Sequence, residues 1–136
     1  MNKENYYTFS DAWVFMALFQ YSSEEKIIDL TNIIAQGDML NHAIFTLEEL
    51  SLGFRKLQIK GLIKIEENKI SLTQEAVGIK EEVMGSKEGF FSMGDLTLKL
   101  LNSSQPEFKD LSFELISKCE FLSEENLTKA YNQYSK

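Results

Sequence analysis

Apolar residues recur at helical spacing along most of this chain, and the pattern predicts a mainly helical protein. The first helix is expected over about residues 11–22, with Ser10 and Asp11 as its cap. Every residue from Ala12 to Phe19 is apolar in this helix. A helix that is apolar all round must be covered on more than one side, so the C-terminal segment or a second subunit should pack on it.

A second helix is expected over about 25–36, with Gly37 as its C-cap. The eight residues that follow, 38–45, are strongly apolar and should pack inward with a short helical turn. A fourth helix should begin at Thr73 and end near Met84, and a last helix should follow Ser123. Helices are therefore predicted at about 25–36, from Thr73 to about Met84 and after Ser123.

The third helix, expected over residues 46–61, carries the strongest local signals. Thr46 and Glu49 have the spacing of a capping box, and Gly61 is suited to end the helix. Short apolar strands are predicted over 62–66 and 69–72, with a turn at 67–68 where Asn68 tolerates left-handed backbone. The sequence therefore predicts a helix followed directly by a β-hairpin.

Residues 85–94 contain three glycines and are expected to form a linker or an exchangeable arm. The stretch from 95 to 122 fits helical and strand spacing equally, so both remain open. Phe90 and Phe91 in the arm are candidate protein contacts, with core filling as the alternative.

The order helix, helix, helix, hairpin, helix over residues 10–85 resembles a winged helix-turn-helix domain. The third helix closes with Phe54, Leu57, Gly61, Leu62 and Ile63 in the pattern FxxLxxxGLI. Leu-Thr at 72–73 then follows the hairpin, as in that family. The resemblance covers about 60% of the chain. It implies a mainly α winged helix domain over 1–85 with a short β-hairpin wing. A mostly helical C-terminal extension over 86–136 should pack on the first helix.

In winged helix domains the third helix lies where it can enter the major groove of DNA. With Leu50, Phe54 and Leu57 inward, a turn of 100° per residue places five residues outward. These are Glu48, Leu52, Arg55, Lys56 and Ile59. Glu48 and Glu49 in the first turn and Glu66-Glu67 at the wing tip repel phosphate, and Leu52 and Ile59 do not read bases. Leu52 and Ile59 are therefore candidate protein contacts.

The formal net charge is −7, but residues 55–80 hold six cationic side chains against three acidic ones. Five of these cations could contact the phosphates of a nucleic acid: Arg55, Lys56, Lys60, Lys64 and Lys69. Six cations on two amphipathic elements also fit an ordinary solvated surface. DNA binding is thus possible but is not favoured by the charge.

Enzyme chemistry has little support in the sequence. His42 is the only histidine and Cys119 the only cysteine, so we expect no catalytic residues, no metal site and no cofactor. Adjacent carboxylates such as Glu24-Glu25 splay apart and do not form acid/base pairs. The lone cysteine and the absence of an export signal predict a cytoplasmic protein, and the apolar runs are too short to span a membrane.

These features predict a non-catalytic winged-helix interaction module that self-associates and has a regulatory role. Its partner would be a second copy or another protein. The alternative is a DNA-binding transcriptional regulator that uses the basic segment 55–69.

Overall fold

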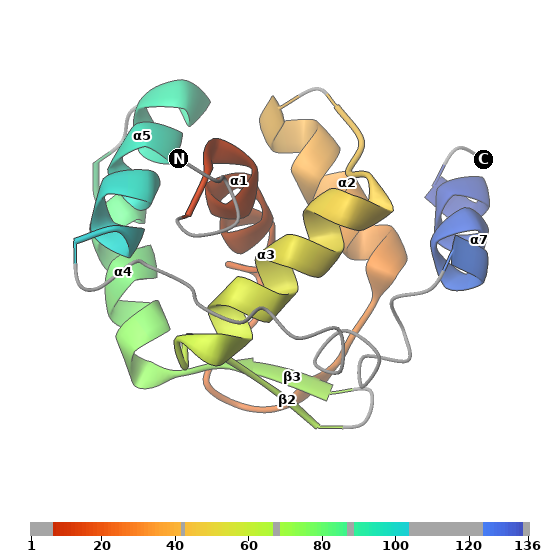
Figure 1. Cartoon of the computed structure of the whole chain (residues 1–136), viewed down its shortest axis with the longest axis horizontal. Helices are drawn as coiled ribbons and strands as arrows, with labels where there is room; N and C mark the ends of the chain where they lie inside the picture. The colour runs from red at the N-terminus through yellow and green to blue at the C-terminus, as the bar shows by residue number, and fades with distance from the viewer. Residues whose placement is uncertain (1–6, 42, 67–68, 87–88, 104–123, 135–136) are drawn as a thin grey trace.

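The computed structural model describes residues 7–41, 43–66, 69–86, 89–103 and 124–134. This part of the chain is mainly helical, with a small three-stranded antiparallel sheet at one end (Figure 1). The helices are α1 (Phe9–Ala17), α2 (Leu30–Asn41), α3 (Leu47–Ile59), α4 (Gln74–Met84), α5 (Phe90–Leu101) and α7 (Glu124–Tyr134). The strands are β1 (Lys26–Ile27), β2 (Ile63–Glu66) and β3 (Lys69–Leu72).

Helix α1 begins and ends earlier than the sequence predicted. Its cap is Thr8, whose hydroxyl accepts from the Asp11 N–H at 3.4 Å, while the Asp11 carboxylate accepts from the Thr8 N–H at 2.8 Å. Ser10 and Asp11 therefore lie in the first turn. Asp11 contributes to the capping box from inside the helix, and the N-cap residue is Thr8. At the other end the Gln20 amide donates to the Ala17 carbonyl at 3.1 Å, which helps to end the helix there.

The second helix begins later than the sequence predicted. Lys26 and Ile27 form β1, and α2 begins only at Leu30, where the Asp29 carboxylate accepts from the Asn32 N–H at 3.2 Å. The helix then runs through Gly37 to Asn41.

The expectation that Gly37 is a C-cap is wrong, because a tertiary contact requires it inside the helix. A Cβ atom at Gly37 would lie 2.2 Å from the Phe45 ring. The Trp13 indole also donates to the Gly37 carbonyl at 2.9 Å. Phe45 is fully buried, whereas Met39 and Ile44 are exposed, so the stretch 38–45 packs inward only in part.

The predicted cap of α3, its end at Gly61 and the two strands of the hairpin are confirmed. Thr46 and Glu49 form the capping box. The helix ends in a Schellman motif, in which the Leu62 N–H donates to the Leu57 carbonyl, and Gly61 has a φ of +72°. Glycine adopts this left-handed conformation at little cost, so the chain can turn directly into β2.

Strand β3 is the centre of the sheet, in the order β1-β3-β2. In the hairpin Ile63 pairs with Leu72, and Glu66 pairs with Lys69. β1 joins the other edge of β3 and was not predicted, because two exposed residues carry no alternating pattern. Residues 67 and 68, the predicted turn, lie outside the described residues.

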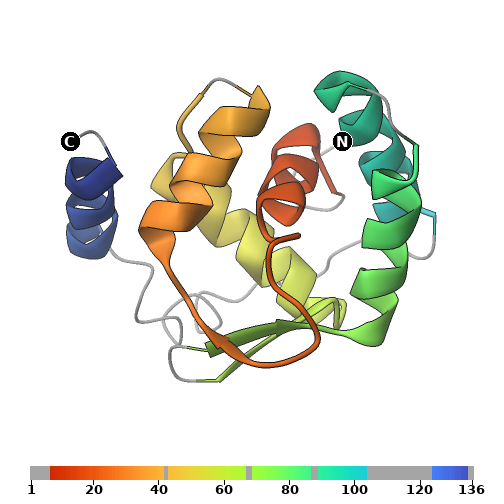
Figure 2. The same cartoon turned by 180° about the vertical axis from the view of Figure 1, so that it is seen from behind.

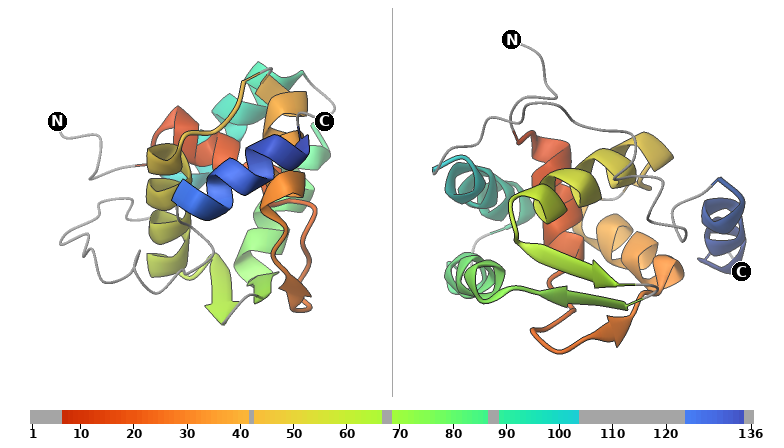
Figure 3. Two further views of the ribbon diagram at one scale, coloured as in Figure 1. Left: turned by 90° about the vertical axis from the view of Figure 1, so that its right-hand side faces the viewer. Right: turned by 60° about the horizontal axis from the view of Figure 1, so that its bottom comes forward.

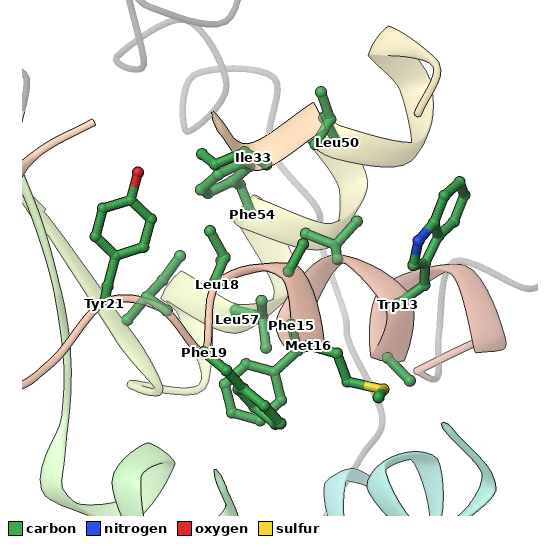
Figure 4. Packing of buried hydrophobic residues seen from close by; sticks show 14 of the residues in the cluster. Trp13, Phe15, Met16, Leu18, Phe19, Tyr21, Ile33, Leu50, Phe54 and Leu57 are labelled. Carbon is green, nitrogen blue, oxygen red and sulfur yellow. The ribbon is translucent and has the colours of Figure 1, made fainter. Parts of the chain in front are cut away.

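Helix α1 is the centre of the molecule, with α3, α2 and α5 packed around it. Figure 4 shows Phe15, Met16 and Phe19 on the side of α1 turned away from Leu50 and Phe54 of α3. Every residue from Asp11 to Ala17 is buried, which explains the continuous apolar run.

Helices α4, α5 and α7 complete the described fold. α5 packs on both α1 and α4, while α7 packs on the outer side of α2 (Figure 3). Helix α5 covers residues 90–94, which the sequence predicted to be part of a linker or arm. It also covers residues 95–101, for which the sequence left helix and strand open. Residues 104–123 lie outside the described part. Met84 is the last residue of α4, beyond the buried Val83, and it is 54% exposed.

Candidate functional site

The outward side of α3 is the site that the sequence singled out. The capping box at Thr46 anchors the helix start, and the Ser10 hydroxyl of α1 donates to the Glu49 carboxylate at 3.1 Å. The first turns of α1 and α3 therefore meet side by side. Their approach is close, because a Cβ atom at Gly53 would lie 2.9 Å from Val14 of α1.

Lys56 of α3 is held inside the protein. Its ammonium lies 2.8 Å from the Asp11 carboxylate, and the two side chains are only 1% and 2% exposed. The same carboxylate oxygen accepts from the Thr8 N–H and, at 3.1 Å, from the Thr8 hydroxyl. Burial of two charges is tolerated only when each is paired and hydrogen-bonded, as the carboxylate of Asp11 is here.

Tyr7 lies beside this pair. Its hydroxyl donates to the Lys56 carbonyl at 3.4 Å. Burial, reinforced by the negative charges of Asp11 and Glu75, raises the pKa of Tyr7 far above its ordinary value, so the hydroxyl stays protonated at neutral pH. Both charged side chains are thus buried, with the neutral Tyr7 hydroxyl beside them.

The expectation that Lys56 and Arg55 face outward is wrong. Lys56 points toward α1, because its long stem reaches Asp11 from the flank of α3. Arg55 is only 6% exposed. The buried arc of α3 is wider than the stripe of Leu50, Phe54 and Leu57, so two of the five proposed phosphate contacts are not at the surface.

The remaining proposed phosphate contacts are at or near the surface. Lys60 is half-buried, and Lys64 and Lys69 are exposed on the hairpin. Lys64 lies 3.7 Å from the Glu66 carboxylate, and Lys69 faces Glu66 across the strand pair. Each of these two cations is therefore partly offset by a nearby carboxylate.

Three residues define the outward side of α3. Glu48 is exposed, Leu52 is half-buried, and Ile59 is 41% exposed. We call this set the α3 outer face. It is apolar and acidic, as the sequence predicted, and it lacks the two cations that were expected on it.

A cleft next to the α3 outer face was not foreseen. It has a volume of about 260 Å³ and lies where the first turns of α1 and α3 meet. Its lining includes three acidic residues, Asp11, Glu48 and Glu49, together with Leu52 and Lys56. The repeated Thr-x-x-Asp/Glu spacing at residues 8–11 and 46–49 was a sequence signal, but only the fold shows that the two capping boxes are adjacent.

Several other candidates can be placed only in part. Phe90 begins α5, and the side chains of Phe90 and Phe91 lie outside the described part, as do His42 and Cys119. Within the described ranges, no three His, Cys, Asp or Glu side chains gather as a metal site would require. Of the helices in the described part of the chain, none combines the length and apolar character that crossing a membrane demands.

Comparison of the chain with protein-family models, with curated proteins and with solved structures gave no match.

Proposed function

We propose that this protein is a non-catalytic winged-helix interaction module with a regulatory role, which associates with a second copy of itself through the α3 outer face. The order α2, α3, β2, β3, α4 and the glycine turn into the hairpin support the winged-helix part of the proposal. The division into a domain over 1–85 and an extension over 86–136 is part of the same proposal.

The observation that carries the proposal is the buried pair between Lys56 and Asp11. A helix that reads DNA needs its cations at the surface to contact phosphates and bases. Here the Lys56 ammonium is used inside the fold, and the outer face offers Leu52, Ile59 and a carboxylate instead. Apolar side chains rimmed by charge are typical of protein contacts.

Self-association can be tested by changing Ile59 to Glu and measuring the molar mass in solution. Ile59→Glu should convert the oligomer to a monomer, because a carboxylate would replace an apolar contact beside the acidic first turn of α3. The matched control is Ile44→Glu, since Ile44 has a similar exposure of 48% but lies before α3. Far-UV circular dichroism should show unchanged helix content in both variants. A monomeric wild type, or an oligomer that survives Ile59→Glu, would contradict the proposal.

The alternative is a DNA-binding regulator, and exposed Lys64 and Lys69 favour it. It can be separated from the proposal by fluorescence anisotropy with mixed-sequence duplex DNA across a salt series. We expect no binding stronger than about 10⁻⁴ M at physiological salt, which is the weak end of non-specific binding. Micromolar binding with a steep salt dependence, lost in Lys64→Glu/Lys69→Glu, would establish the alternative.

A further inference from the structure

An apolar groove lies between α1, α2, α4 and α5. Figure 2 shows α1 between α2 on one side and α4 with α5 on the other. The groove has a volume of about 280 Å³ where these helices meet. Its apolar lining comes from all four helices and the turn after α1: Met16 of α1, Phe19 just beyond it, Leu40 of α2, Met84 of α4, and Met93 of α5.

The floor of the groove is the side of α1 that α3 does not cover. Phe19 packs edge-on against Phe15 with ring centroids 5.1 Å apart, so the floor is a packed apolar surface. The wall is more exposed to solvent than the floor, because the Met84 side chain is 54% exposed. A concave, mainly apolar lining of this kind is typical of binding sites.

Methionine is concentrated at this groove. Met16, Met84 and Met93 line it, and Met39, which is 70% exposed, is adjacent in sequence to the lining residue Leu40. Three of the four methionines in the described ranges therefore line the groove. Methionine side chains are flexible and polarizable, and they form surfaces that adapt to the apolar side chains of a partner.

One charged side chain lines the groove. Lys80 lies in α4, one turn before Met84, and the described residues form no ion pair with it. The other polar lining comes from the amides of Gln20 and Gln36. A partner that fills the groove should therefore carry a carboxylate next to its apolar side chains, so that Lys80 gains an opposite charge as it loses water.

We propose that this groove binds an amphipathic helix of another protein that presents apolar side chains at i and i+4 with an acidic residue between them. The volume is slightly below the range of about 300–1,000 Å³ for small-molecule sites, and it suits one or two inserted side chains. Helix-in-groove recognition uses anchors at this spacing. The groove is separate from the α3 outer face, so the proposal stands or fails independently of self-association.

The test uses the full chain labelled with ¹³C at the methionine methyls, followed by NMR. The probe is a designed helical peptide of about 16 residues with leucine at i and i+4 and one Glu between them. Addition of the peptide should shift the methyl signals of Met16, Met84 and Met93. Met84→Glu should abolish binding, because a carboxylate would then face the apolar anchors. The matched control Ile27→Glu, at 72% exposure on β1, should bind like wild type.

The charge requirement has its own test. Lys80→Glu should weaken binding of the Glu peptide by roughly tenfold, and a peptide with Lys in place of that Glu should recover it. Three results would overturn the proposal: no shift at millimolar peptide, unchanged binding in Met84→Glu, or equal binding of both peptides by wild type and Lys80→Glu. A Met84 signal that shifts with protein concentration alone would also overturn it, by identifying a second copy as the occupant.

Discussion

Lys56 and Asp11 are 45 residues apart in the chain, yet they form one buried polar unit. Replacement of a buried ion pair by apolar residues is often neutral, whereas removal of one partner leaves a charge buried without its counter-ion. The pair therefore links α1 to α3, and removal of either partner alone should be costly. It also explains why this lysine of α3 is absent from the surface.

Lys56→Met should destabilise the protein by about 3–5 kcal/mol, because the Asp11 carboxylate would stay buried without its cation. The double variant Asp11→Leu/Lys56→Met should lose less than Lys56→Met alone. Urea unfolding measures both free energies. Lys64→Met is the control: its ion pair with Glu66 is at the surface, so the change should stay within about 0.5 kcal/mol. A double variant that lost as much stability as Lys56→Met would show that the unpaired Asp11 carboxylate is not the cause of the loss in the single variant.

At the scale of elements, the contact between α1 and α3 depends on a glycine within a helix. Gly53 lies in the middle of α3, where glycine has a low helix propensity. Val14 of α1 explains this glycine. A Cβ atom added at Gly53 would lie 2.9–3.0 Å from three carbon atoms of the Val14 side chain. The local cost of glycine is accepted because the two helices can then approach closely.

Gly53→Ala should therefore destabilise the protein by about 1–3 kcal/mol through overpacking, despite the gain in helix propensity. The control is Gly78→Ala in α4, where an added Cβ meets nothing within 4 Å. That change should stabilise by about 0.5–1 kcal/mol. Thermal or urea unfolding of the two variants tests the difference. If both were stabilised equally, α1 and α3 would not be in the close contact described.

At the scale of the whole molecule, α7 is a peripheral helix held to α2 by its own apolar face and by two tyrosines. Leu127 and Ala130 are buried at this contact. The Tyr131 hydroxyl donates to the Phe45 carbonyl, and the Tyr134 hydroxyl donates to the Asp38 carboxylate. Both donors must be protonated, so the attachment of α7 depends on pH.

The pKa values of both tyrosines are raised above the ordinary value of about 10. Burial is the main cause for Tyr131, and the hydrogen bond to Asp38 is the main cause for Tyr134. A raised pKa in the folded state means that the stabilisation is fully present below about pH 10 and is lost as pH rises above it. We therefore expect α7 to detach from α2 in this alkaline range.

Methyl NMR can follow the release, with Leu127 reporting on α7 and Val14 on the contact between α1 and α3. The Leu127 signal should move to its unfolded position at a lower pH than the Val14 signal. Tyr131→Phe/Tyr134→Phe should weaken the attachment at neutral pH, because two hydrogen bonds are lost, and it should remove the dependence of the attachment on pH above 10. If the two signals changed together in the wild type, α7 would not be a separate unit.

The sequence by itself determined those features whose interactions close within a few residues. The capping box at Thr46, the turn at Gly61 and the pairing of β2 with β3 were predictable, because each depends on hydrogen bonds between near neighbours in the chain. The start of α4 after Thr73 was predictable for the same reason. The acidic and apolar character of the α3 outer face also followed from helical geometry.

Only the tertiary structure decided which side chains those elements bury. Periodicity places a lysine on one side of a helix, but whether its long stem reaches Asp11 depends on a second helix distant in sequence. The position of Gly37 within α2 depends in the same way on Phe45 and Trp13. The methionine-lined groove exists only where four helices meet, so no local pattern could reveal it. Local hydrogen bonds define the elements, and packing between distant segments defines the surfaces through which this protein can act.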